Sequence, residues 1–250
     1  MPLNSKVVRS KTGAFMKHLL LTLLVAGLSA VLVFQVWYPQ HLWKMVGGIE
    51  LYFLMLSVEL TLGPVMSLVI FHPNKSRKEL VRDYLIIGVI QMSALVYGLY
   101  VVAQSRPVFL VFVKDRIEVI TPVEIAAGDL AQGHNGFDRL PWFGPQRICV
   151  SSPSDVDEQN RLLFSAVFNG KDIQNYPQYY RSCLAGRWLE KAYADDQLRE
   201  LVKEKNSDIL LPNSSFSWLP VRHRFGVWVE IYPADDTEQA HFLPFDPFYY

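Results

Sequence analysis

The sequence predicts an α+β protein in which a three-helix transmembrane anchor precedes a small α+β domain outside the cytoplasm. Apolar residues crowd into the first 103 of its 250 positions, whereas the remainder has the composition of a soluble domain. Residues 1–83 hold nine Lys or Arg against four Asp or Glu, and residues 104–250 hold 15 against 20. This distribution indicates two parts in different surroundings and does not fit a strongly basic nucleic-acid-binding protein.

Three segments have the length and composition of membrane-spanning helices. Residues 19–37 and 84–103 carry no charge, and residues 46–71 carry only Glu50 and Glu59. At about 1.5 Å per residue they would measure roughly 28, 30 and 39 Å in that order, against a hydrocarbon core of about 30 Å. The predicted parts are a basic tail at 1–18, a transmembrane region at 19–103 and a domain at 104–250.

The basic residues that flank these spans predict the orientation. The tail at 1–18 and the loop at 72–83 each carry four Lys or Arg, whereas the loop at 38–45 carries only Lys44. By the positive-inside rule the N-terminus is cytoplasmic and the chain after Ala103 lies outside. An aromatic belt is expected at the outer interface, formed by Trp37, Tyr38 and Trp43.

The first span could instead be a cleaved signal peptide, because its flank is basic. Its apolar run is longer than the usual 7–15 residues of such peptides. It ends in FQVWYP at 34–39, without a small-x-small cleavage site. We therefore expect residues 19–37 to stay as a membrane helix.

The domain at 104–250 shows signals for both strands and helices. A β-rich pair with Lys114-Asp115 between its halves predicts a hairpin or a bulged strand. Two further segments look helical, the first with Leu162, Leu163 and Val167 on one face. The expected elements are strands at 107–113 and 116–120, a helical turn at 125–130, helices at 153–168 and 186–205, and a closing hairpin of 218–221 with 225–231. The aromatic tail at 241–250 reads either as a docked extended segment or as a partner-binding tail.

Both cysteines, Cys149 and Cys183, lie in the domain expected outside the cytoplasm, where a disulfide could form. The alternative is two unrelated buried thiols, and spacing alone does not decide between them. Six scattered histidines and two cysteines show no metal-ligand spacing, so we expect no metal site.

Glu59 is the most informative single residue, because a carboxylate near the middle of a span costs about 2.5 kcal/mol or more. Gly63 lies one turn further on and would let another helix approach closely. Pro64 removes a backbone donor and is expected to kink the helix. One interpretation is an internal hydrogen bond to Gln91 or Ser93. The others are a polar contact for another protein's membrane helix and a proton relay.

Glu50 lies near the outer interface and carries less information than Glu59. The two carboxylates are nine residues apart and fall on opposite faces of a helix, so a shared protease-like site is not expected. The sequence has no GxSxG, P-loop, GxGxxG, HExxH or CxxC motif. We therefore expect no catalytic residues and no cofactor.

The chain resembles the TfpX/TfpZ type IV pilin accessory family, which is related to the fimbrial assembly protein FimB, over nearly its whole length. The second-span carboxylate of that family is often Asp or Glu, and Glu59 fits this pattern. The cysteines are not carried over from the resemblance. The motifs that carry it are GGIE at 47–50, ELTLGP at 59–64, SLVIF at 67–71, YGLYVVAQSRP at 97–107, VFVKDR at 111–116, LPWFGP at 140–145, LFSA at 163–166 and YPQYY at 176–180.

The resemblance implies a non-enzymatic factor of the bacterial inner membrane that helps to assemble or stabilise a cognate type IV pilin. Its domain would be periplasmic, and the membrane contact would use Glu59, Gly63 and Pro64, with Glu50 as a further candidate. Two other classes stay open: a scaffold that binds the pilus machinery or minor pilins, and a pilin-modifying enzyme.

Overall fold

The computed structural model describes residues 5–183, 188–235 and 239–248, which fall into two compact units. The helical unit comprises the residues up to 35 together with 49–103. The sheet unit comprises residues 36–48 together with those from 104 onward. The loop between the first two long helices therefore belongs to the sheet unit rather than to the helices that it connects.

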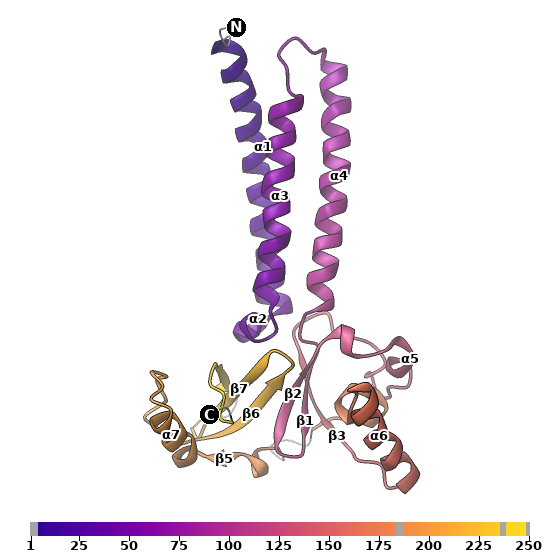
Figure 1. The fold of residues 1–250 in the computed structure, drawn as a ribbon, viewed down its shortest axis with the longest axis vertical. Helices are drawn as coiled ribbons and strands as arrows, with labels where there is room; N and C mark the ends of the chain where they lie inside the picture. Colours follow the sequence, from indigo (N-terminus) through magenta and orange to yellow (C-terminus); the bar gives the residue numbers. More distant parts are fainter. Residues whose placement is uncertain (1–4, 184–187, 236–238, 249–250) are drawn as a thin grey trace. The chain divides into compact units, whose positions relative to one another are not determined.

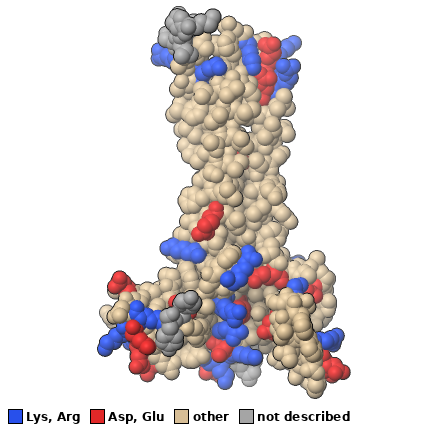
Figure 2. Space-filling view, in the orientation of Figure 1, with Lys and Arg blue, Asp and Glu red and all other residues tan. Residues whose placement is uncertain are grey.

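Three long helices lie side by side in the helical unit (Figure 1). All three have the length and apolar composition needed to cross a membrane. Figure 2 shows charged side chains gathered at the end where the chain begins and where α3 turns into α4, followed by a long uncharged band. The helices are α1 (Ser5–Val31), which continues as the π-helical segment η1 (Leu32–Trp37), α3 (Gly48–Ile70) and α4 (Arg77–Gln104).

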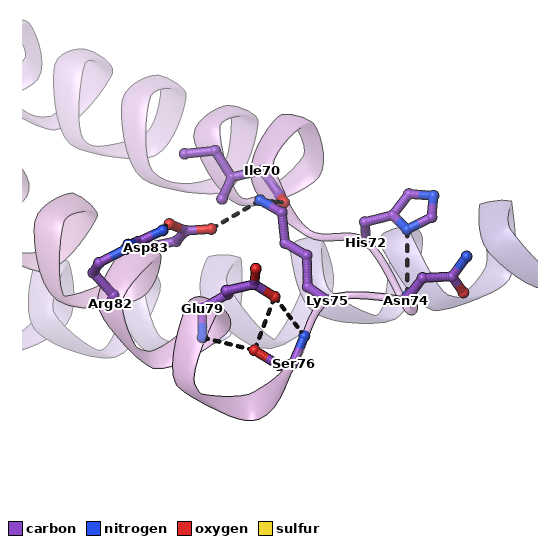
Figure 3. Close-up of polar contacts among 8 residues, drawn as sticks. All are labelled: Ile70, His72, Asn74, Lys75, Ser76, Glu79, Arg82 and Asp83. Carbon is purple, nitrogen blue, oxygen red and sulfur yellow. Dashed lines mark hydrogen bonds and ion pairs between the residues drawn. The ribbon is translucent and has the colours of Figure 1, made fainter.

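The turn between α3 and α4 is tied by side chains (Figure 3). The Lys75 ammonium donates to the Ile70 carbonyl and to Asp83, both at 2.8 Å. Ser76 and Glu79 form a capping box, in which the Glu79 carboxylate accepts from the Ser76 amide at 2.8 Å and the Glu79 amide donates to the Ser76 hydroxyl at 3.3 Å. The end of α3 and the start of α4 are thus both capped.

The sheet unit is built on one mixed sheet, which agrees with the predicted α+β class. The expected hairpin of β1 and β2 is present, and its Lys114 has the positive φ of 59° that a tight turn needs. The strands are β1 (Phe109–Val113), β2 (Arg116–Ile120), β3 (Gln146–Val150), β4 (Tyr180–Arg181), β5 (Tyr193–Ala194), β6 (Phe216–His223), β7 (Gly226–Pro233) and β8 (His241–Leu243). The helical segments are η2 (Pro39–His41), α2 (Leu42–Met45), η3 (Pro122–Glu124), α5 (Ala127–Leu130), α6 (Val156–Asn169), η4 (Ile173–Asn175), η5 (Pro177–Tyr179), η6 (Leu189–Lys191) and α7 (Asp195–Glu204).

The strand order is β4-β3-β1-β2-β6-β7-β8, and β5 pairs with β6. The pairs β1–β3 and β2–β6 are parallel, and the others are antiparallel. One apolar cluster packs around β1 and β3, and a second lies between α7 and the hairpin of β6 and β7. In the structure Cys149 of β3 and Cys183, just after β4, form a disulfide.

The sheet is strongly curled, as the contact between Arg147 of β3 and Glu230 of β7 shows. Their strands are four places apart, which would separate them by about 19 Å in a flat sheet. Instead the guanidinium donates to both carboxylate oxygens, at 2.5 and 3.0 Å. Two residue pairs, Ile117–Val221 and Glu118–Arg222, join β2 to β6.

The segment 36–48 is packed into the sheet unit. Tyr38, Leu42 and Met45 are almost fully buried, and α2 contacts β7. Trp37 is also buried, at 6% exposure. The expectation that Trp37 and Tyr38 form an aromatic belt is therefore wrong, because both side chains are buried, whereas Trp43 is only partly buried.

The predicted helix at 186–205 is shorter in the structure. Residues 184–187 lie outside the described residues, Leu189–Lys191 form the short helix η6, and α7 begins only at Asp195. Tyr193 and Ala194 pair with β6, and this pairing holds the chain extended up to the helix. Of the two predictions for the tail at 241–250, the docked extended segment is confirmed, since β8 pairs with β7 and Phe245 is buried.

The predicted helix at 153–168 is confirmed as α6, which starts after its N-cap Asp155 and ends at Gly170 with a φ of +66°. The assignment of its apolar face needs correction. Leu162 packs against the core, but Leu163 and Val167 are 60% and 68% exposed. The helix therefore presents apolar side chains to its surroundings as well as to the sheet.

Candidate functional site

A buried stripe runs along α3 at helical spacing. Its members are Tyr52, Met55, Glu59, Gly63 and Ser67, which recur every three or four residues. This spacing places them on one face of the helix, the face turned toward α1 and α4. The stripe is unusual for an apolar helix because it contains a carboxylate and two further polar groups.

Glu59 is held inside the helical unit with 6% of its surface exposed. Its Oε1 has no hydrogen-bond partner among the residues that the structure describes. The Gln91 amide lies close enough to the Glu59 carboxyl group to interact with it, and it also donates weakly to the Glu59 main-chain carbonyl, at 3.5 Å. Ser93 instead donates to the Val89 carbonyl, so Gln91 is the third-span side chain next to Glu59. A buried carboxyl oxygen without a partner is costly, and it is available to a donor from another molecule.

Gln91 connects the helices around Glu59. Its Oε1 lies 2.8 Å from His18 Nε2, and its Nε2 donates to the Thr22 hydroxyl at 3.2 Å. Since the amide oxygen can only accept, His18 Nε2 is the donor in this contact. One side chain of α4 thus joins α1 to the main chain of α3 at the depth of Glu59.

Gly63 allows α4 to approach α3 at this point. A Cβ at position 63 would lie 2.5 Å from Gln91 Oε1, so glycine is the residue that leaves the amide in this position. A second close approach occurs at Gly98 of α4, which lies against the Met55 side chain. Pro64 lies inside α3, which stays helical to Ile70.

Hydrogen bonds join the helices at two further depths. The Tyr52 hydroxyl donates to the Ala26 carbonyl at 2.7 Å and lies 3.1 Å from the Ser29 hydroxyl, which joins α3 to α1. The Ser67 and Tyr84 hydroxyls are 2.8 Å apart and join α3 to α4. These contacts connect α3 to each neighbour.

A groove of about 420 Å³ lies between α1 and α4, with α3 as its floor. Most of its lining surface is apolar, and its polar side chains include Glu59 and Gln91. This size and composition are typical of a site that binds a predominantly apolar group and orients it by a few polar contacts. The lining residues are Lys17, His18, Leu21, Thr22, Val25, Ala26 and Ser29 of α1, Met55, Leu56 and Glu59 of α3, and Tyr84, Gly88, Gln91, Met92 and Leu95 of α4.

The sheet unit offers a second candidate surface on α6. Leu163, Phe164, Val167 and Phe168 are each at least 59% exposed. The rings of Phe164 and Phe168 stack, with centroids 6.1 Å apart. A contiguous apolar patch of this kind on a folded domain marks an interaction site more often than chance.

Comparison with known proteins assigns the chain to a family. It is 36% identical over 228 residues to the fimbrial assembly protein of serogroup I from Dichelobacter nodosus, covering 91% of this chain and 82% of that protein. The chain belongs to the FimB fimbrial assembly family. The serogroup E1 protein of the same organism is 30% identical over the same shares, and the FimB family model matches residues 6–47. No solved structure matches the chain.

In this FimB-family chain the structure brings together three of the four residues singled out from the sequence. Glu59, Gly63 and Pro64 are all buried on α3. Glu50 is exposed and does not line the groove. Sequence reasoning missed His18 and Thr22, although both are polar residues at the edge of, or inside, an otherwise apolar run.

Metal-ligand clusters are absent from the part of the chain that the structure describes. Its residues contain no group of three or more His, Cys, Asp or Glu that could hold a metal ion. A buried polar cluster of the sheet unit joins Arg147 with Glu230 and Tyr232, whose hydroxyl accepts from Arg147 at 2.9 Å. Burial disfavours the charge on Arg147, but Glu230 and Tyr232 outweigh burial and raise the Arg147 pKa. This cluster closes the curled sheet and therefore serves the fold.

Proposed function

We propose that this chain is a non-enzymatic inner-membrane factor that helps to assemble or stabilise a cognate type IV pilin. It binds the pilin helix within the membrane and the pilin head in the periplasm. The observation that carries the proposal is the buried Glu59 oxygen without a partner, at the floor of an apolar groove, in a member of the FimB fimbrial assembly family.

The groove chemistry defines what would bind there. A membrane helix laid between α1 and α4 would fill apolar volume, and a hydroxyl, amide or ammonium group on it would donate to Glu59 Oε1. Such a hydrogen bond forms away from water, where an unsatisfied carboxyl oxygen is most costly. Pairing with Glu59 therefore favours a helix with a donor at that depth over a uniformly apolar one.

Two contacts on one partner would strengthen a weak interaction. We assign the apolar face of α6, formed by Leu163, Phe164, Val167 and Phe168, to the pilin head. A pilin held by its membrane helix is presented to this face at high effective concentration, so neither contact needs to be strong. A factor that binds in this way can release its client when the fibre grows.

The charge pattern supports the orientation in which the sheet unit is periplasmic. Arg77, Lys78 and Arg82 lie in the first two turns of α4, and Arg82 is seen next to Asp83 in Figure 3. The Arg82 side chain is 72% exposed. By the positive-inside rule the α3–α4 turn is cytoplasmic. The disulfide of Cys149 and Cys183 fits an oxidising compartment. A phosphatase fused after Tyr250 would be active in this orientation, whereas activity only of a cytosolic reporter would refute it.

Deletion of the gene with replacement of the pilin tests the proposal. We expect fewer surface fibres after deletion, and a defect that depends on which pilin is expressed. A defect that is identical for all pilins would favour a scaffold of the machinery instead. The mass of the pilin should be the same with and without this chain, and a changed mass would indicate a modifying enzyme.

A further inference from the structure

The loop at 140–145 carries two of the most exposed aromatic side chains of the sheet unit. Trp142 is 69% exposed and Phe143 is 84% exposed. Large aromatic side chains are normally buried or bound, because each removes a large apolar area from water when covered. Adjacent exposed Trp and Phe therefore need a partner.

This loop is tied to the ends of two candidate membrane helices. On one side of the two aromatics, the Pro141 carbonyl accepts from the Arg106 guanidinium at 3.0 Å, and Arg106 lies two residues after the end of α4. On the other side, the Gly144 amide donates to the Val36 carbonyl at 2.9 Å, and Val36 lies in η1. Both attachments are within the sheet unit.

The backbone and the aromatic rings fix the loop at this place. Gly144 has a φ of +56°, which favours glycine, and a Cβ there would lie 3.4 Å from the Pro39 ring. The Arg106 guanidinium lies 5.9 Å from the Trp37 ring centroid and 5.7 Å from that of Trp142. Trp142 is thus linked through Arg106 to the last residue of the first candidate span.

We propose that Trp142 and Phe143 insert into the headgroup region of the bilayer and anchor the sheet unit to the membrane surface. The loop is hydrogen-bonded to Val36, one residue before the end of the first candidate span, and to Arg106, two residues after the end of the third, so these bonds would hold it near the interface when both spans cross a bilayer. Trp is enriched at that level, since its ring is apolar and its N–H can remain hydrated. In this proposal the loop at 140–145, more than 100 residues further along the chain, forms the interfacial aromatic contact that the sequence had predicted for Trp37 and Tyr38.

We assign lipid rather than protein as the partner of Trp142 and Phe143, because their loop is bonded to Val36 and Arg106, which lie at the ends of two candidate membrane spans. The proposal requires α1 and α4 to cross a bilayer, but it requires neither a particular orientation nor a pilin. Its failure would therefore leave the assembly role standing, and failure of the assembly role would leave the anchor standing.

A nitroxide attached to Phe143→Cys in the full chain, reconstituted in phospholipid nanodiscs, tests the anchor. Asp115→Cys is the matched control, because Asp115 is exposed in the turn that follows β1, beyond Val113, which lies about 13 Å along the strand from Phe109. We expect the label at 143 to relax faster with oxygen than with a water-soluble nickel chelate, and the label at 115 to show the opposite order. Nickel access at 143 equal to that at 115 would overturn the proposal. Exclusion of both reagents at 143 would also overturn it, because protein would then cover the site.

A second measurement needs no added cysteine. Trp142→Phe should remove part of the tryptophan fluorescence that brominated phospholipids quench in the unmodified chain. An unchanged quenched fraction would contradict insertion of Trp142, whatever the folding yield of the cysteine variants.

Discussion

Gly63 of α3 lies directly beneath the Gln91 amide of α4, with 2.5 Å between a Cβ built at position 63 and Gln91 Oε1. We expect Gly63→Ala to push the Gln91 amide, the end of a flexible side chain, out of its hydrogen bonds with His18 and Thr22, at a cost of about 0.5–1.5 kcal/mol. Thermal unfolding of the purified full chain in detergent measures this. Gly27→Ala is the matched control, since a Cβ there meets nothing within 4 Å.

Shortening the opposing side chain should relieve the clash. The Gly63→Ala, Gln91→Ala double variant is expected to be more stable than the sum of the two single effects implies. Strict additivity would show that the two residues do not contact each other.

The groove can be filled without touching Glu59. Gly88 lines the groove and has nothing within 4 Å of a built Cβ. Gly88→Leu should therefore fold normally and yet reduce the number of surface fibres, because its side chain occupies the volume assigned to the pilin helix. Gly27→Leu, on α1 outside the groove lining, should leave fibre number unchanged. Equal fibre counts for both variants would argue against the groove as the binding site.

Glu59 is expected to serve function at the expense of stability. Glu59→Leu removes a buried oxygen without a partner and should stabilise the helical unit by about 1–3 kcal/mol. The same variant should reduce fibre number, since the acceptor for the pilin helix is lost. Thermal unfolding and fibre counts on one variant separate the two effects. A variant that is destabilised instead would mean that Glu59 has a structural partner.

The Arg147–Glu230 pair should behave as one unit. Arg147→Met leaves the Glu230 carboxylate, of 0% exposure, without its main partner and should cost about 3–5 kcal/mol. The Arg147→Met, Glu230→Leu double variant should recover most of this loss, because no buried charge remains. Chemical denaturation of the full chain measures both, and a double variant no better than the single one would contradict the account.

The buried ring of His223 should make the folded protein less stable in acid. Burial, with a smaller effect of Arg224 and an opposing one of the Met45 main chain, lowers its pKa from 6.5 to about 4. Between these values the unfolded chain binds a proton that the folded chain does not, so stability falls by about 3 kcal/mol as the pH drops from 6.5 to about 4. Thermal unfolding across this range should show the fall, and His223→Phe should reduce it. An equal fall in the variant would assign the effect to other groups.

The sequence predicted the elements whose signals are local. The hairpin of β1 and β2, the helix α6 and the β6–β7 hairpin each carry their own turn or cap residues, such as Lys114, Asp155 and Arg224. The strand β3 was missed because its pairing with β1 is parallel and depends on residues far along the chain. The break before α7 was missed for a related reason, since Tyr193 is held extended by pairing with Trp218 rather than by its own neighbours.

The candidate site was predictable only in part. Glu59 and Gly63 are conspicuous in an apolar span, and Gln91 is a polar residue at a similar depth in the next. The groove itself was not predictable, because its width depends on how α1 and α4 pack on α3. The curl of the sheet and its Arg147–Glu230 closure likewise arise from tertiary packing.

Photocrosslinking from the groove in living cells tests the central claim most directly. A photoreactive amino acid at Met92, which lines the groove and is 58% exposed, would be compared with one at Phe53, which is 57% exposed but outside the lining. We expect a pilin adduct from position 92, much less from position 53, and loss of the adduct in the Gly88→Leu background. Adducts from position 92 only with lipid or with this chain itself would contradict the claim that the groove holds the pilin helix.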